Sequence, residues 1–255
     1  MRNSQDLSGA GVCARYAFAP NLYHYCGPDT GGELGEYVKA NLADGKLIEY
    51  LTKFETLYPY LKAIAVANDI PDPLDKRVVE AYWVGNELLE QVSKKAMYAA
   101  LVEGQRLPKR LPKKGMRGLL PKIDQQARLH HSFHVLNVFI RTGHRMVAET
   151  VETMEECRIS WGEVISNFQF SILNQFSNVK FSINSQKLIY KEGKLKLEPS
   201  VREVVVVQEA LSENIRPGDW VSVHWGIVCD QLNEKQVKQL EKYTLHHLRL
   251  ANETI

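Results

Sequence analysis

The chain has 255 residues, enough to form one large domain or two small ones around an apolar core. Charged residues make up 24% of it and the formal net charge is only +2, which indicates a folded protein and argues against a dedicated nucleic-acid-binding protein. No stretch approaches the roughly 20 apolar residues of a membrane span, and residues 1–8 lack the apolar core of a signal peptide. The cysteines are widely scattered, as is typical of reduced thiols, so we expect a cytoplasmic protein; they are Cys13, Cys26, Cys157 and Cys229.

The first half of the chain predicts helices. Residues 33–58 place apolar side chains mostly at helical spacing, with Gly45 as a candidate break, and residues 75–102 predict one long amphipathic helix. The segment before residue 33 reads as a loop. Residues 105–122 contain three prolines, two glycines and seven basic residues, which predicts a basic, proline-rich connection.

The second half predicts short strands separated by turns. Apolar, β-branched runs occur at residues 179–183, 187–190, 201–207 and 220–228, and Glu192 and Gly193 suit a tight turn between two of them. A helix with Asn233 as its cap and Gln236 three residues later is expected to close the chain. We therefore predict an α+β fold, with a mainly helical domain at residues 1–150 and a small β-barrel with a C-terminal helix at residues 151–255.

Cys157 and His224 are the leading candidates for metal ligands. In the strand that begins at Trp220, alternation places Val221 and Val223 on the apolar face and His224 on the opposite face, so His224 need not be a core residue. Cys157 precedes the first strand, where we expect its thiol to be reachable from outside. A thiolate and an imidazole suit a soft metal or low-spin iron. On spacing alone, a buried inert cysteine and a surface histidine remain the more frequent outcome.

A family resemblance supports the metal interpretation. Residues 155–250 resemble the HypC/HupF family of hydrogenase maturation chaperones, which are small OB-like barrels with a C-terminal helix. The resemblance runs through Cys157, Gly162, Val164, Arg202, Glu203 and Val204, through Pro217 to Ile227, and into Leu232 to Gln236. The family's cysteine follows the initiator methionine, whereas Cys157 is internal, and Trp161 stands where the family usually has a proline.

The resemblance implies a function as well as a fold. Cys157 and His224 would hold iron, as an Fe(CN)2CO fragment with cyanide and carbon monoxide ligands. A HypD-like maturation protein and the precursor of the [NiFe] hydrogenase large subunit would be the partners. The whole chain is also similar to an uncharacterised family found beside hydrogenase genes, through the Tyr-Cys-Gly-Pro phrase at residues 25–28 and the histidine-rich phrase at residues 130–134. We therefore expect an accessory chaperone of hydrogenase maturation rather than an enzyme.

The alternative is a metal-dependent enzyme with a site in the first half, formed by Cys26, His130, His131 and His134. On a helix or on a strand, His130 and His134 would share a face, and the apolar residues that follow favour a strand. The spacing of a zinc protease is absent, as are a glycine-rich phosphate loop and a nucleophile elbow. A third reading is an interaction protein that kept the barrel and lost its iron.

Overall fold

The computed structural model describes residues 8–255 except 141, 144, 146–147 and 174–175, and describes residues 166–178 by their backbone alone. Residues 1–7, which are most of the N-terminal segment without the apolar core of a signal peptide, lie outside the described residues. The first half folds into helices, as predicted, although they are shorter than expected. They are α1 (Gly9–Leu22), α2 (Glu33–Ala40), α3 (Gly45–Thr52), α4 (Tyr58–Ala67), α5 (Lys76–Trp83), η1 (Glu87–Gln91), α6 (Lys94–Ala99), η2 (Ala100–Gly104), α7 (Leu107–Arg110), α8 (Lys113–Asp124), α9 (His131–Phe133), η3 (His134–Val138) and α10 (Val151–Cys157).

Helix α1 lies in the middle of the molecule, although its sequence was read as part of a loop. Ser8 caps it by accepting a hydrogen bond from the amide of Gly11, and residues 9–21 are all buried. The helix is rich in alanine and glycine, which lets neighbouring elements approach its backbone closely; a Cβ on Gly9 would lie 1.8 Å from the carbonyl oxygen of Leu74. The loop reading failed because a helix buried on every side carries no amphipathic pattern.

The predicted helix at residues 75–102 is wrong as a single element. The chain leaves α5 at Gly85, which has a φ of +99° and packs against the ring of Tyr243. Asn86 then adopts extended backbone angles and caps η1, and Ser93 caps α6. Polar capping side chains therefore divide a sequence whose apolar spacing alone suits one continuous helix.

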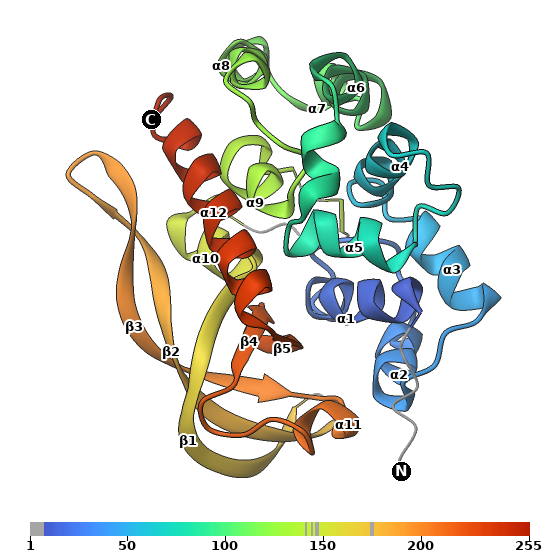
Figure 1. Ribbon diagram of the computed structural model, residues 1–255, viewed down its shortest axis with the longest axis vertical. Helices are drawn as coiled ribbons and strands as arrows, with labels where there is room; N and C mark the ends of the chain where they lie inside the picture. Colours follow the sequence, from blue (N-terminus) through green and yellow to red (C-terminus); the bar gives the residue numbers. More distant parts are fainter. Residues whose placement is uncertain (1–7, 141, 144, 146–147, 174–175) are drawn as a thin grey trace.

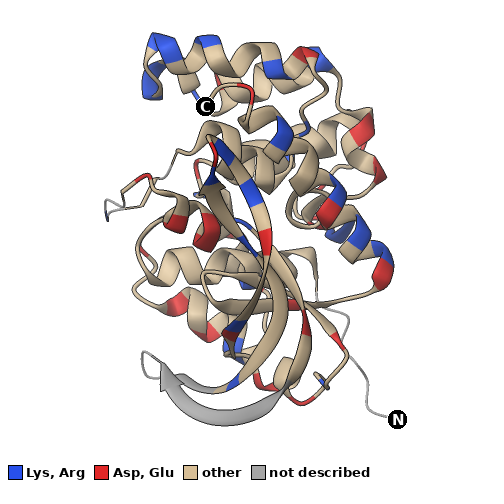
Figure 2. Cartoon of the chain, turned by 90° about the vertical axis from the view of Figure 1, so that its left-hand side faces the viewer, with Lys and Arg blue, Asp and Glu red and all other residues tan. Residues whose placement is uncertain are grey.

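The basic segment 105–122 is also more ordered than predicted, because it forms α7 and most of α8. Pro108 lies in the first turn of α7 and Pro112 is the N-cap of α8, positions where a missing amide proton costs no helical hydrogen bond. Lys113, Lys114 and Arg117 are exposed on α8. Figure 2 shows basic residues along the helices at the upper end of the molecule.

The strand expected after His134 is wrong as well, since this segment is the short helical unit of α9 and η3. The imidazole of His130 starts this unit by accepting a hydrogen bond from the amide of Ser132 at 3.1 Å. Histidine is not among the residues that usually cap a helix, so the sequence contained no sign of a helix start at His130. The β-branched and aromatic residues that follow it favour a strand, and the prediction followed them.

The second half forms a five-stranded sheet and a final helix, as predicted in outline. The runs predicted at residues 179–183 and 187–190 belong to one strand, and the run predicted at residues 220–228 is divided into two strands by a turn at Trp225 and Gly226, which both have positive φ. The elements are β1 (Ser160–Leu173), β2 (Phe176–Lys191), β3 (Lys194–Val206), α11 (Glu209–Ser212), β4 (Trp220–His224), β5 (Ile227–Leu232) and α12 (Glu234–Ala251). Strands follow one another in the closed order β1-β2-β3-β5-β4, because β4 also pairs antiparallel with β1. The turn at Glu192 and Gly193 is confirmed, with both residues at positive φ.

Helix α12 joins the two halves of the molecule. Its predicted cap is confirmed, since Asn233 and Gln236 each bond the other's backbone amide at 3.0 Å. It contacts α9 as well as β3, and Figure 1 shows the strands at the lower left, helices α1 to α7 on the right and α8 at the top. One apolar cluster contains side chains from both halves, among them Tyr16, Trp83, Trp161, Ile227 and Leu240. No helix in the described part of the chain is both long and apolar enough to cross a membrane.

Candidate metal centre

Three metal-ligating side chains from distant parts of the chain converge in the interior. His131 lies in α9, Cys157 is the last residue of α10, and His224 is the last residue of β4. One ring nitrogen of each histidine and the sulfur of Cys157 all lie within 4.8 Å of one another, and all three residues are buried. A small movement would bring them to the shorter spacing of ligands around one ion.

The orientation of His224 follows from the packing of β4 against α1. Its Nδ1 donates a hydrogen bond to the carbonyl oxygen of Tyr16 at 2.7 Å, so its lone pair is on Nε2. Ser222, on the same face of the strand, bonds the hydroxyl of Tyr16 at 2.9 Å. The predicted alternation is therefore confirmed, but this face lies against α1 and His224 is only 1% exposed.

His131 is held in the complementary manner. Its Nε2 donates to the carbonyl oxygen of Cys157 at 2.8 Å, which leaves a lone pair on Nδ1; that atom accepts a hydrogen bond from the hydroxyl of Tyr82 at 3.1 Å. Burial lowers the pKa of His131 well below its usual value, and the nearby His224 and His134 act in the same direction. The imidazole is therefore neutral at pH 7, which is the form that binds a metal.

Cys157 is buried, so the prediction of a thiol reachable from outside is wrong. Glu155 holds the junction between α10 and β1 in the interior. Its carboxylate forms ion pairs with Arg158 at 2.6 Å and with Arg202 at 2.9 Å. The amide of Trp225 also donates to the carbonyl oxygen of Glu156 at 2.8 Å. Since Glu156 precedes Cys157 and Trp225 follows His224, this bond holds the two candidate ligands close together.

The cluster faces a small cavity of about 30 Å³. The cavity is large enough for a metal ion. Its wall includes two further residues of the alternative site, Cys26 and His134. The sulfur of Cys26 lies 3.7 Å from the hydroxyl of Thr56, and His134 bonds Tyr60 and the carbonyl oxygen of Ile140.

Three of the four residues of the alternative site, Cys26, His131 and His134, therefore line one cavity. His130 is absent from the cavity wall. It belongs to a different network, in which its Nδ1 and the Nδ1 of His247 each lie 2.7 Å from the hydroxyl of Ser132. The shared face expected for His130 and His134 is not formed, because His130 precedes the helix as its cap.

Sequence reasoning placed His131 in the alternative site and did not link it to Cys157 and His224. It also missed Tyr16 and Tyr82, which fix the two imidazoles. No rule of sequence spacing connects residues 131, 157 and 224. One sequence alone therefore could not indicate that these three residues lie together.

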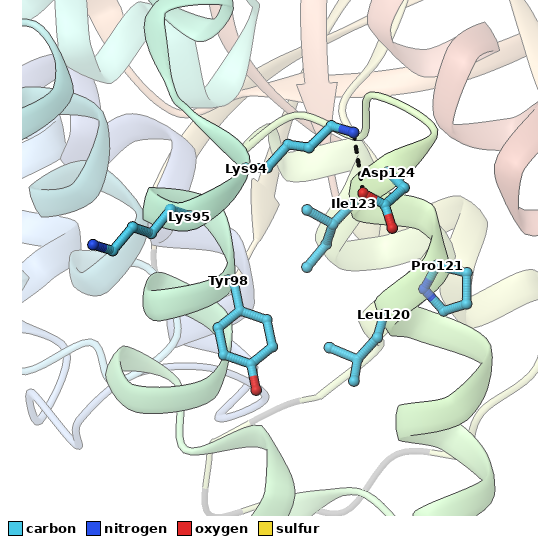
Figure 3. A pocket seen from close by; sticks show the side chains of 7 residues that line it. All are labelled: Lys94, Lys95, Tyr98, Leu120, Pro121, Ile123 and Asp124. Carbon is cyan, nitrogen blue, oxygen red and sulfur yellow. Dashed lines mark hydrogen bonds and ion pairs between the residues drawn. The ribbon is translucent and has the colours of Figure 1, made fainter.

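A second hollow lies on the surface between α6 and α8. It is lined by Tyr98, Leu120 and Pro121 among others, and Lys94 and Asp124 form an ion pair of 3.0 Å at one end (Figure 3). None of its described lining residues is a cysteine or histidine, and it shares none of them with the buried cavity. It therefore lacks the thiolate and imidazole donors of the buried cluster.

Comparison with known proteins gives the chain a family but no described relative. No curated protein and no solved structure matches it. One family model does match, over residues 5–255, and its description is a family of unknown function, DUF6390. Because this match covers nearly the whole chain, both halves and all three candidate ligands included, the protein belongs to the DUF6390 family.

Proposed function

We propose that this protein binds a transition-metal ion, iron in the first place, through His131, Cys157 and His224, and acts as an accessory protein of [NiFe] hydrogenase maturation. The observation that carries the metal-binding proposal is the convergence of the three side chains within 4.8 Å in the interior. Buried histidines and cysteines are common, but three of them from separate elements facing one cavity are a more specific arrangement.

The surroundings of the cluster suit a metal. Each imidazole donates its other N–H to a backbone carbonyl, which is the second-shell arrangement usual for metal-bound histidine. One thiolate and two neutral imidazoles favour iron, zinc or copper over magnesium or calcium.

The assignment to hydrogenase maturation depends on the HypC/HupF resemblance. The closed strand order β1-β2-β3-β5-β4 followed by α12 agrees with the OB-like barrel and C-terminal helix of that resemblance. In the proposal, the iron fragment is cargo and passes between a HypD-like protein and the large-subunit precursor. The iron fragment carries three diatomic ligands, so we expect the cavity of about 30 Å³ to widen when the whole fragment is loaded.

The test is anaerobic co-purification with a HypD-like partner, followed by infrared spectroscopy of the cyanide and carbon monoxide stretches. We expect the bands in the wild-type protein and their loss in Cys157→Ala, His224→Ala and His131→Ala. The control is His246→Ala, because His246 is a half-buried histidine of α12 outside the cavity. Bands that survive the Cys157 and His224 substitutions would contradict the proposal.

A metal-dependent enzyme is the second candidate, and one observation favours it: Cys26 and His134 line the same cavity as the cluster. In that case His134 would be a ligand and Cys26 would meet a substrate. The two candidates differ in a simple measurement. Loss of bound metal in His134→Ala supports the enzyme, whereas the proposal above expects His134→Ala to keep its metal.

A further inference from the structure

Cys26 differs from the other cysteines in its position relative to the cavity. It lines the cavity together with His131, Cys157 and His224, but it is only partly buried, whereas those three are buried. Cys13 and Cys229 are buried and absent from the cavity wall, and burial raises the pKa of the Cys13 thiol to about 12. Cys26 is therefore the thiol nearest to solvent on the wall of this cavity.

The loop that carries Cys26 covers the end of β4. The ring of Tyr25 packs on the ring of Trp225 at 4.6 Å, and Trp225 directly follows His224. The loop is held from outside by backbone hydrogen bonds to Gly143 and Arg145. A Cβ on Gly143 would lie 2.1 Å from the carbonyl oxygen of His24, so this close contact requires glycine. Displacement of the loop would open the cavity beside both Cys26 and His224.

From this placement we propose that Cys26 is an entry ligand, which takes the metal from solution or from a donor and passes it to Cys157. This inference rests on the proposed function, since it presupposes the metal site. The thiol of Cys26 loses its proton when the metal binds to its sulfur. In the transfer, the bond between the metal and the Cys157 sulfur forms as the bond to the Cys26 sulfur breaks, and one proton leaves Cys157 while one returns to Cys26 through solvent. The metal keeps its oxidation state, so no oxidant or reductant is needed.

The probe for this inference is Co²⁺, whose bond to a thiolate gives a charge-transfer absorption band. Loading of the full-length protein is followed by stopped-flow mixing with Co²⁺, and release by mixing the loaded protein with excess chelator. In Cys26→Ser we expect both rates to fall at least about tenfold, with an equilibrium affinity within about threefold of wild type, because an entry ligand changes rates in both directions equally. Cys229→Ala, which removes a buried thiol outside the cavity, should change neither rate.

Alkylation of the folded wild-type protein gives a second measurement that does not depend on refolding a variant. Iodoacetamide should modify Cys26 before the buried cysteines and should slow Co²⁺ loading as Cys26→Ser does. Unchanged rates in Cys26→Ser overturn the inference, and so does a loss of affinity as large as that of Cys157→Ala, which would make Cys26 a permanent ligand. A wild-type protein with no thiolate–cobalt band at all would instead overturn the proposed function.

Discussion

Tyr82 competes with a metal for the same lone pair of His131. Its hydroxyl donates to Nδ1 of His131 at 3.1 Å, and Nδ1 is the atom left for a metal because Nε2 donates to Cys157. Burial raises the pKa of Tyr82 well above its usual value, so the hydroxyl keeps its proton and stays a donor. A metal on His131 must displace this hydrogen bond.

Tyr82→Phe should therefore affect the metal-free and the metal-bound protein in opposite ways. Without metal, the lone pair of His131 loses its donor, and we expect the free energy of unfolding to fall by about 1–2 kcal/mol. Because the metal-bound protein does not use that hydrogen bond, the affinity for Co²⁺ should rise by up to about tenfold. Chemical denaturation in chelator and Co²⁺ titration measure the two effects. A weaker affinity in Tyr82→Phe would show that Tyr82 assists binding instead.

Helix α10 carries Cys157 at its end, and ion pairs of Glu155 hold this end of the helix in the interior. Glu155 is 4% exposed at its side chain; it bonds Arg158, Arg202 of β3 and the amide of Leu188 in β2. Arg158 also donates to the carbonyl oxygen of Gln186 in β2. A single buried carboxylate thus connects α10 to two strands. Its loss leaves the buried Arg158 without its anion, while Arg202 keeps only the more exposed Glu156.

Glu155→Gln should destabilise the fold by about 3–5 kcal/mol, the usual effect of breaking a buried ion pair by removing one partner. Glu156→Gln is the matched control, because Glu156 is the adjacent glutamate and also pairs with Arg202, but its side chain is 41% exposed. That change should cost about 0–1 kcal/mol. Urea denaturation of both variants tests the difference. A loss of stability in Glu155→Gln no larger than that in Glu156→Gln would contradict this prediction.

Across the whole molecule, a buried histidine network joins α12 to α9. His247 accepts a hydrogen bond from the backbone amide of Arg128 at 3.1 Å and lies 2.7 Å from Ser132, which in turn bonds His130. Burial lowers the pKa of His247 well below its usual value, and His130, His246 and Arg128 act in the same direction. His247 therefore stays neutral in the folded protein at pH values at which it is protonated in the unfolded chain.

This difference predicts how stability depends on pH. Above the unfolded pKa of about 6.5 both states are neutral at His247 and its contribution to stability is complete. As the pH falls below about 6.5 the unfolded chain takes up the proton, so the folded state loses about 1.4 kcal/mol per pH unit for each such histidine.

The measurement is the free energy of unfolding between pH 7 and pH 5 in the presence of a chelator. His247→Gln should reduce the slope of unfolding free energy against pH by the equivalent of about one proton. His246→Gln should reduce this slope less, because His246 is only half-buried. A slope that is unchanged in His247→Gln would contradict the argument.

Secondary structure was predictable wherever a local rule decided it. The turn at Glu192 and Gly193 and the cap at Asn233 depend on residues at fixed short spacings, and both were predicted. The helix predicted at residues 75–102 failed because Gly85 turns against Tyr243, a residue far along the chain. Helix α1 was missed because burial on all sides removes the periodicity that identifies a helix.

Local sequence was thus sufficient for the order of the fold, with helices first and a sheet and helix after them, and for Cys157 and His224 as candidates. Their burial, and the inclusion of His131 beside them, depended on packing. The carbonyl oxygens of Tyr16 and Cys157, and the bond between Trp225 and Glu156, come from segments up to 208 residues apart in sequence. Such contacts arise from the docking of α1, α9 and α10 on β4, for which no short-range pattern exists.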